Sequence, residues 1–411
     1  MLRQAGSRQQ TIKQKNRALV LQAVLNRGIV SRAEIARSLG LTKTTLTNIV
    51  SELIEDGILE ESEPFSSENG GMGRKSIGLT LSGEAPLICG VLIQRGNLHV
   101  VLADLKGEIQ IDSRYRYRGL ISPEEFRHRL ETLYLQTCSQ ARQRILAVGI
   151  SCIGNLNTVE GIMRNPHHFF TEACDFPITS FLEGLSNLPV WLCNDASAGA
   201  IAEKLFGKGR DVEDFLYIST FNGIGAGFYL GNRLYNGEFG QNGEIGHMSI
   251  NHWGPQCVCG NNGCLEVYAD ISRILQGYRH FQEYLPDHPL LAMQNPTISD
   301  LLPLIDSGDI LAMCILTEYC RYLAAAVSNL LTQLDISLVI LAGSPKTTGN
   351  FFENTLAHML NETAAPGKYR DTIVVKSDFG LDSPLYGSVG IVLDKIFTAE
   401  LDPSTRTDFS D

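Results

Sequence analysis

Three cysteines lie within eight residues of one another, at Cys257, Cys259 and Cys264, and His247 precedes the first of them by ten residues. Glycine and asparagine residues between the thiols allow the backbone to turn tightly around a single ion. A Cys₃His set suits tetrahedral Zn²⁺, and four protein ligands leave no open coordination position, which is typical of a structural site. Such a dense cluster is seldom a group of unrelated thiols, so we predict a zinc site.

The predicted zinc loop spans 247–264, and within it His252 is an alternative to His247 as the fourth ligand. The other cysteines lie in apolar stretches, and nothing in the sequence indicates export to a disulfide-forming compartment. We therefore expect them to be reduced thiols in the core. They are Cys89, Cys138, Cys152, Cys174, Cys193, Cys314 and Cys320.

A second group of residues could contact DNA. The helix expected over 43–56 presents short hydrogen-bonding side chains and one cation in its first turns. Recognition helices contact base edges and phosphates with their N-terminal residues, and Thr and Asn side chains suit both kinds of contact. The predicted contacts are Lys43, Thr44, Thr45, Thr47 and Asn48.

Local signals place this recognition helix in a helix-turn-helix. Apolar residues at helical spacing predict a first helix over 12–26. Ser31, with Glu34 three residues later, forms a capping box for a second helix that ends at Gly40. Thr42 then caps the third, and the tight turn between the last two is typical of the motif.

The helices are followed by a β-wing at about 58–81. Two strand-like runs flank a Gly/Ser-rich loop that ends in Arg74 and Lys75, and these cations are further predicted DNA contacts. The runs are 58–61 and 76–81. The sequence therefore predicts a winged helix-turn-helix domain over 1–81.

Charge is distributed unevenly along the 411-residue chain. Its net charge is −11, but residues 1–50 carry nine Lys and Arg against one acid, so residues 51–411 carry −19. This asymmetry favours DNA as the partner of the N-terminal module. The alternatives are a solvated basic helix and a small helical cap on an enzyme.

Composition indicates a globular protein, with 44% hydrophobic and 19% charged residues. We find no apolar run of the ~18–20 residues that a membrane-spanning helix needs. Residues 1–17 lack the apolar core of a signal peptide. We expect a cytoplasmic protein without membrane insertion.

The body, 86–400, alternates strand-like and helix-like segments, which predicts an α/β architecture with a largely parallel sheet. Each half opens with strands and carries Gly-rich turns, so we expect two lobes of duplicated fold. The expected strands are 87–93, 98–104, 145–150, 190–193, 215–219, 225–230 and 338–341, and the expected helices are 123–144, 196–206 and 311–333. The polar segment 401–411 is expected to be a flexible tail.

Several motifs resemble the ROK family (repressors, open reading frames, kinases), and the likeness extends over nearly the whole chain. They are Gly243-Glu244-Ile245-Gly246-His247, the three-cysteine cluster with Leu265-Glu266, and Asn194-Asp195-Ala196-Ser197-Ala198. The wing sequence from Gly71 to Lys75 is similar to that of the repressor branch, the relatives of the glucose, N-acetylglucosamine and xylose repressors.

The resemblance implies a two-lobed, actin-like ATPase fold that binds a hexose between its lobes. By position in the family's motifs, the sugar-contacting residues are Asn194, Asp195, Glu244, His247 and Glu266. Asp195 matches the base that accepts the proton of the sugar hydroxyl in the kinases; it also opens a helical stretch and is a candidate N-cap. His247 can bind metal and sugar together only through different ring nitrogens.

The sequence departs from the family's kinases at the ATP phosphates. Leu92 stands where the kinases carry the metal-serving Asp, and Gln94 and Arg95 replace the following glycines. In the second phosphate loop, Phe221 and Asn222 replace a glycine and a threonine. We therefore predict a protein that is not an enzyme.

The sugar side also departs from the kinases. The kinases' Pro-Asn-Leu is Pro166-His167-His168 here, and the Pro-Gly of the preceding loop is Ile153-Gly154. We expect an effector other than ordinary glucose.

These features predict a transcriptional regulator, a repressor of carbohydrate uptake or catabolism genes that is controlled by a sugar or sugar phosphate. Its partners would be operator DNA and the effector, and it would act as a homodimer or homotetramer. Zinc would fix the positions of the sugar-contacting residues. The alternatives are a sugar kinase with an accessory helix-turn-helix and a repressor controlled by a sugar-transport protein.

Overall fold

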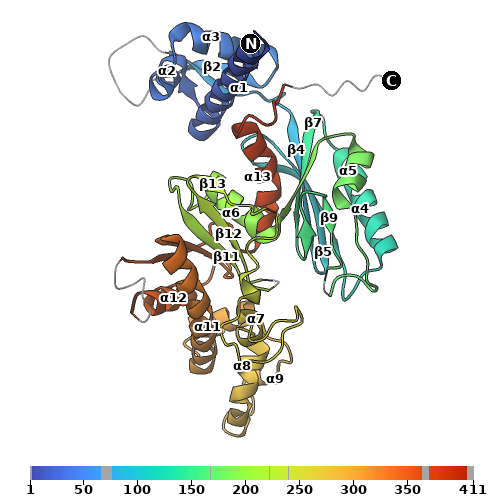
Figure 1. The fold of residues 1–411 in the computed structure, drawn as a ribbon, viewed down its shortest axis with the longest axis vertical. Coiled ribbons are helices and arrows are strands. Elements are labelled where there is room, and N and C mark those ends of the chain that lie inside the picture. The colour runs from blue at the N-terminus through green and yellow to red at the C-terminus, as the bar shows by residue number, and fades with distance from the viewer. Residues whose placement is uncertain are drawn as a thin grey trace. The chain divides into compact units, whose positions relative to one another are not determined.

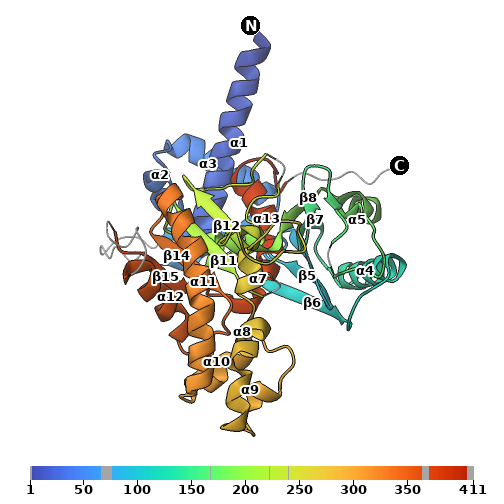
Figure 2. The same cartoon turned by 60° about the horizontal axis from the view of Figure 1, so that its bottom comes forward.

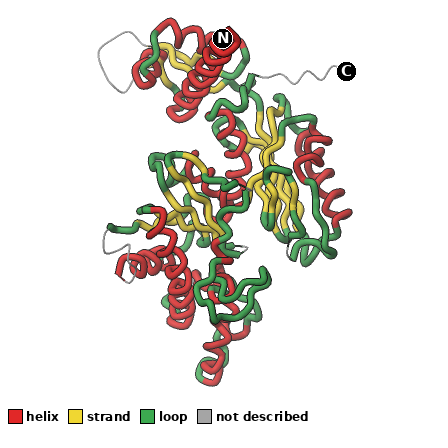
Figure 3. The backbone as a smooth tube through the Cα atoms, in the orientation of Figure 1, coloured by secondary structure: helices red, strands yellow, loops and turns green. Residues whose placement is uncertain are grey.

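The structure is a computed structural model that describes residues 2–65, 76–166, 168–221, 223–238, 240–362 and 370–404. Its contacts divide the chain into two compact units, each of which contains a five-stranded sheet with helices (Figure 1, Figure 3). The first unit comprises Met1–Cys152, Gly161–Leu192 and Ser388–Asp411. The second comprises Ile153–Glu160 and Cys193–Gly387.

The N-terminal part of the first unit is a winged helix-turn-helix, as predicted. Its helices are α1 (Leu2–Arg27), α2 (Arg32–Leu39) and α3 (Lys43–Glu55). Its strands are β1 (Val30–Ser31), β2 (Leu59–Phe65) and β3 (Ser76–Leu81), in the order β1-β3-β2. The first helix begins ten residues earlier than the apolar pattern indicates, because its N-terminal half is polar.

Local hydrogen bonds fix the turn between α2 and α3. The Ser31 hydroxyl accepts from the Glu34 N–H at 3.3 Å, and the Glu34 carboxylate accepts from the Ser31 N–H at 3.0 Å. The Ser31 N–H and the Ser31 hydroxyl, the latter at 2.7 Å, both donate to the Glu34 carboxylate, and these two bonds hold the pKa of Glu34 below its ordinary value. Gly40 ends α2 at φ 64°, and the Thr42 hydroxyl accepts from the Thr45 N–H at 3.2 Å. The predicted capping box and both helix boundaries are therefore confirmed.

The sheet of the first unit has the strand order β10-β7-β4-β5-β6. The strands are β4 (Leu87–Gln94), β5 (Asn97–Ala103), β6 (Ile109–Arg116), β7 (Ile145–Cys152) and β10 (Val190–Asn194). Helix α4 (Pro123–Cys138) packs on β5 and β6. On the other face, α13 (Ser383–Phe397) approaches so closely that a methyl group at Gly149 would overlap the Ser388 carbonyl.

The sheet of the second unit has the order β13-β12-β11-β14-β15. The strands are β11 (Phe215–Ser219), β12 (Gly225–Leu230), β13 (Arg233–Leu234), β14 (Leu338–Ala342) and β15 (Ile373–Lys376). Helix α6 (Asp195–Phe206) packs on β11 and β12, and α12 (Phe351–Glu362) packs on β15.

One helix, α11 (Ile310–Leu334), is long and apolar enough to span a membrane by length and composition alone. This corrects the expectation that no such segment exists. Residues such as Ile315, Leu323 and Val327 of this helix are nevertheless fully buried in the core of the second unit, where they contact α12, α8 (Ile271–Tyr278) and α10 (Ile298–Asp306).

Both sheets are mixed, so the expectation of a largely parallel sheet is wrong. Strands β4, β5 and β6 form an antiparallel meander, as do β11, β12 and β13. Parallel pairing then adds β7 to β4, β14 to β11, and β15 to β14. The tight hairpins at the start of each half make antiparallel pairing the shorter connection. The repeated pattern confirms a duplicated fold.

The remaining elements are short connections. The predicted helix 123–144 ends at Cys138, because the chain must turn back to begin β7. Elements not yet named are β8 (Leu156–Asn157), β9 (Ile162–Met163), α5 (Ile178–Ser186), η1 (Ile245–His247), α7 (Leu265–Tyr268), η2 (Arg279–Glu283), α9 (Pro289–Ala292) and η4 (Gly380–Asp382).

Candidate DNA-binding face, metal centre and sugar-binding residues

The first turns of α3 present a polar, exposed face. Lys43, Thr44, Thr47 and Asn48 are exposed, whereas Leu46 and the apolar residues after it are buried against the module's core. Thr45 is half-buried because its hydroxyl lies 2.9 Å from that of Thr42, within the cap. Arg74 and Lys75 lie outside the described residues. Four of the five predicted recognition-helix residues are therefore positioned to meet a ligand from solvent.

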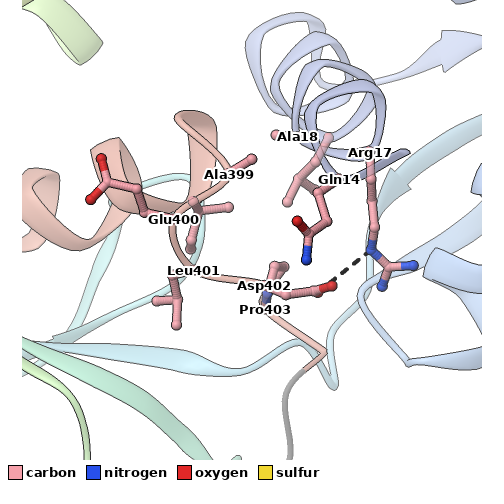
Figure 4. A pocket seen from close by; sticks show the side chains of 10 residues that line it. Gln14, Arg17, Ala18, Ala399, Glu400, Leu401, Asp402 and Pro403 are labelled. Carbon is pink, nitrogen blue, oxygen red and sulfur yellow. Dashed lines mark ion pairs between the residues drawn. The ribbon is translucent and has the colours of Figure 1, made fainter. Parts of the chain in front are cut away.

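Arg17 anchors the module, which the sequence did not predict. Only 8% of the residue is exposed, and its guanidinium meets Glu52 at 3.3 Å, Asp56, and Asp402 at 3.5 Å. Glu52 and Asp56 belong to the end of α3, whereas Asp402 follows α13 (Figure 4). One buried cation therefore ties the recognition helix, α1 and the C-terminal segment together.

A pocket of about 210 Å³ lies beside this ion cluster, within the first unit (Figure 4). Ala18 and Leu21 of α1 line one side, and Leu401 and Pro403 line the other. Within the segment expected to be a flexible tail, Asp402 meets Arg17 and the Pro403 carbonyl accepts from Arg144. Residues 405–411 lie outside the described part of the chain.

The four predicted zinc ligands come together in the second unit. Their ligand atoms all lie within 4.8 Å of one another, with His247 Nδ1 3.6 Å from Cys257 Sγ and Cys259 Sγ 3.6 Å from Cys264 Sγ. Zn–S and Zn–N bonds of about 2.3 and 2.05 Å in a tetrahedron place sulfur atoms about 3.8 Å apart and sulfur and nitrogen about 3.6 Å apart. The donor set and its spacing therefore fit Zn²⁺ closely.

Backbone turns hold the metal loop in shape. The Cys257 N–H donates to the Asn261 carbonyl at 2.7 Å, and Gly260 follows with φ 92°. Gly263, at φ 66°, lies so close to the Asn251 carbonyl that a side chain could not be accommodated. Glycine is therefore required at both turns.

His252 is not part of this cluster. Its ring lies 5.1 Å from that of Trp253 at the exposed surface of the loop. His247, and not His252, lies with the three thiols.

The predicted sugar residues also belong to the second unit. Asn194 ends β10, and its side chain accepts from the Ser197 N–H at 2.8 Å, so Asn194 is the N-cap of α6. Asp195 is the first residue of that helix, which corrects the reading of Asp195 as the cap. The capping role therefore belongs to Asn194.

Three carboxylates and His247 gather on this side. The Glu266 carboxylate lies 3.9 Å from His247 Nδ1. Glu244 is exposed as a residue, but its carboxyl has lost much of its hydration. This loss, together with the nearby negative charges of Asp195 and Glu266, raises the pKa of Glu244 to about 7. Because Nδ1 faces the thiols, Nε2 is the His247 atom available to a sugar.

The positions that correspond to the kinases' phosphate loops fall in both units. In the first unit, Leu92 is 3% exposed in β4, Gln94 ends that strand, and Arg95 is exposed in the turn to β5. In the second unit, Phe221 is half-buried after β11, and Asn222 lies outside the described residues.

The loop positions that differ from the kinases are partly described. Pro166 is buried, and His168 is exposed with φ 54°, whereas His167 lies outside the described residues. Ile153 is 4% exposed and Gly154 has φ 98°.

All ten cysteines are free thiols. Cys89, Cys152, Cys193 and Cys320 are buried as expected, but Cys138 and Cys174 are half-buried and Cys314 is exposed on α11. The core assignment is therefore wrong for these three, since an apolar neighbourhood in sequence does not say which face of a helix or loop a residue occupies.

Comparisons with known proteins agree with this geometry. The ROK family profile matches residues 89–395, and a profile described as winged helix-turn-helix DNA-binding matches residues 15–60. The xylose repressor of Bacillus subtilis (strain 168) is 27% identical over 386 residues, which cover 93% of this chain and 96% of that protein.

Solved structures show the same likeness. A ROK family transcriptional regulator, a homologue of the E. coli MLC protein, is 26% identical with a TM-score of 0.78, over 95% of this chain and 98% of that one. A ROK family glucokinase from Streptomyces griseus in complex with glucose and AMPPNP is 22% identical with a TM-score of 0.65, over 74% of this chain and 98% of that one. The second likeness is one of fold.

Proposed function

This chain belongs to the ROK family, and we propose that it is a transcriptional repressor of carbohydrate uptake or catabolism genes whose kinase-like body senses a sugar. The observation that most strongly supports this proposal is the exposed polar face of α3, which lies in the same chain as a ROK domain. The matched xylose repressor and ROK regulator are similar over nearly their full length and nearly all of this chain, whereas the glucokinase covers 74% of this chain.

DNA recognition rests on α3 and the wing. Lys43, Thr44, Thr47 and Asn48 would enter the major groove, and Arg74 and Lys75 of the wing would contact phosphates. A homodimer would place two such helices on a palindromic operator, one DNA turn apart. The repressor would then act in the cytoplasm, where its operator is.

Sugar recognition rests on the carboxylates of the second unit. Carboxylates and an amide satisfy vicinal hydroxyls in pairs, which suits Asn194, Asp195 and Glu266. With its pKa near 7, Glu244 is protonated in about half of the molecules at neutral pH, so it can donate as well as accept. A neutral sugar or a sugar phosphate are the candidate effectors.

Zinc would be held by His247, Cys257, Cys259 and Cys264, and would supply a rigid cross-link rather than catalysis. His247 is the last residue of η1, the short helix that begins directly after Glu244. A metal bound to His247 would therefore fix the position of Glu244. It would also fix the direction in which Nε2, the other ring nitrogen of His247, points.

Phosphoryl transfer is not the proposed activity. Leu92 gives an apolar, buried side chain where the kinases place a metal-serving carboxylate, and Arg95 puts a long side chain where phosphate needs close backbone approach. An ATP-coupled assay should show no sugar phosphorylation. Turnover that Asp195→Asn abolishes would overturn this assignment.

The repressor assignment is tested with the protein's own promoter region. Duplex DNA from that region should bind the purified chain at low salt, and one sugar from a panel should both raise the unfolding temperature and release the DNA. If promoter DNA binds no better than unrelated DNA of equal length, the proposal fails. If DNA binds but no sugar affects it, the sensing half of the proposal fails alone.

A further inference from the structure

Strand β6 forms an open edge of the first sheet. Among the described residues, β5 is the only strand paired with it, and Figure 2 shows β6 at the rim of the sheet. An edge strand of this length carries a row of unpaired backbone groups that another strand can join.

The backbone of two arginine residues points to this open side. The Tyr117 N–H donates to the Gly96 carbonyl at 3.0 Å, on the β5 side. Backbone groups alternate in direction along an antiparallel strand, so those of Arg114 and Arg116 are directed away from β5, and Arg118 follows two residues after the end of the strand. The register agrees, because Arg114 lies opposite His99 and Arg116 opposite Asn97.

The side chains of Arg114 and Arg116 lie in a row on one face of the strand, and the exposed Arg118 continues their alternate spacing just beyond it. Arg114, Arg116 and Arg118 are all exposed, whereas Tyr115 between them faces α4, where Glu125 accepts from its hydroxyl at 3.4 Å. Residues two apart on a strand are about 6.7 Å apart. The spacing of the three guanidinium groups therefore matches the spacing of every second residue in an extended peptide.

These cations lack acidic partners in the described structure. Arg114 Nη2 lies 3.4 Å from His99 Nδ1, while the nearest acid on the strand, Asp112, is itself bonded to His99. No ion pair involves Arg116 or Arg118 within the described ranges. Because residues 51–411 carry a net charge of −19, this row is a local reversal of the body's charge.

The row also restricts what can pair with the edge. Like charges placed opposite each other across two strands are destabilising, so β6 of a second copy is a poor partner. Opposite charges in the same places are favourable. Nucleic acid could match the charges but not the outward N–H and C=O groups.

We propose that the open edge of β6 binds an extended acidic segment of a partner protein by strand addition, with Arg114, Arg116 and Arg118 pairing with carboxylates at alternate positions. Backbone hydrogen bonds would supply affinity, and the arginine row would set register and select acidic sequences. This surface would give the protein a second input, independent of DNA and sugar binding.

The test uses the full chain and a fluorescent peptide of alternating Thr and Glu, eight residues long, measured by anisotropy at low salt. Arg114→Gln/Arg116→Gln/Arg118→Gln should weaken binding at least about tenfold. The control Arg127→Gln/Arg142→Gln/Arg233→Gln removes the same charge from other exposed arginines and should change it less than about twofold.

Two further measurements separate strand addition from simple attraction. A peptide N-methylated at alternate residues keeps its charge but loses the backbone donors of one edge, and should bind at least about tenfold more weakly. In hydrogen exchange on the unaltered chain, added peptide should slow the Arg114 and Arg116 amides and leave Ser113 and Tyr115, already bonded to β5, unchanged. Absent peptide binding, equal binding of the methylated peptide, or equal losses in both triple variants would each refute the proposal.

Discussion

Replacing Arg17 by methionine removes the charge that joins α1, α3 and the C-terminal segment. Methionine keeps an apolar stem of similar length, so packing against the neighbouring helix is largely retained. The substitution leaves Glu52, Asp56 and Asp402 facing one another without a cation. The winged helix-turn-helix module should therefore lose stability.

The size of the effect follows from burial. Removing one member of a buried ion pair costs about 3–5 kcal/mol. Here the arginine side chain is 9% exposed, but its partners are 34%, 35% and 32% exposed and can be rehydrated. We therefore expect a loss of about 2 kcal/mol, which corresponds to a roughly thirtyfold larger equilibrium constant for opening of α1 and a proportionate increase in its amide exchange rates.

Hydrogen exchange of α1 amides in the full chain measures this opening directly. Lys13→Met is the matched control, because Lys13 also pairs with Glu52, at 2.7 Å, but its side chain is 58% exposed. That variant should change exchange by less than about threefold. Asp402→Asn should have an intermediate effect if the C-terminal segment contributes. Equal effects of Arg17→Met and Lys13→Met would refute the reasoning that burial makes Arg17 the anchor.

Three further predictions concern the metal, the recognition helix and the acid cluster. Cys264→Ser should lower bound zinc from one to near zero per chain and should lower the unfolding temperature. Cys314→Ser removes an exposed thiol outside the cluster and should do neither. Unchanged zinc content in Cys264→Ser would contradict the site. Lys43→Ala should weaken operator binding and reduce the slope of log affinity against log salt by about 0.9, and an unchanged slope would mean that Lys43 does not meet phosphate. The raised pKa of Glu244 means that its contribution to stability is present below about pH 4.5 and is lost as the pH rises through about 7. Glu244→Gln cannot ionise, so its unfolding temperature should rise relative to the unaltered chain between pH 5 and pH 8, and a difference that does not vary with pH would refute the shift.

Features governed by neighbouring residues could be predicted from the sequence. The Ser31–Glu34 capping box, the Thr42 cap and the strand Ser76–Leu81 depend on contacts within a few residues, and the structure reproduces them. The same holds for the metal cluster, whose three cysteines share one short loop.

Features governed by distant contacts could not be predicted in this way. The choice of His247 over His252 depends on how the loop folds back, and both are histidines within five residues of each other. The Arg17–Asp402 pair joins the two ends of the chain, and no periodicity records it. Parallel or antiparallel pairing likewise depends on connections and register, which an apolar run does not contain.

Helix α13 is one of the covalent connections between the two units. In the second unit, Gly387 of α13 lies against the Ala198 carbonyl of α6, the helix that begins with Asp195. The next residue, Ser388, belongs to the first unit and packs against Gly90 and Gly149 of the sheet. Glycine is required at Gly90, Gly149 and Gly387, because a methyl group at any of them would overlap atoms of the segment packed against it.

Beyond α13, the same segment continues to Asp402, which meets the buried guanidinium of Arg17. A helix transmits displacement along its axis because its backbone hydrogen bonds resist extension. Under the proposed function, a shift of α6 upon effector binding would be passed to the recognition helix through α13 and the segment that follows it. On this reasoning the Arg17–Asp402 pair is part of the output of the sensor, and Asp402→Asn should weaken the coupling between sugar and DNA binding even where each still binds alone.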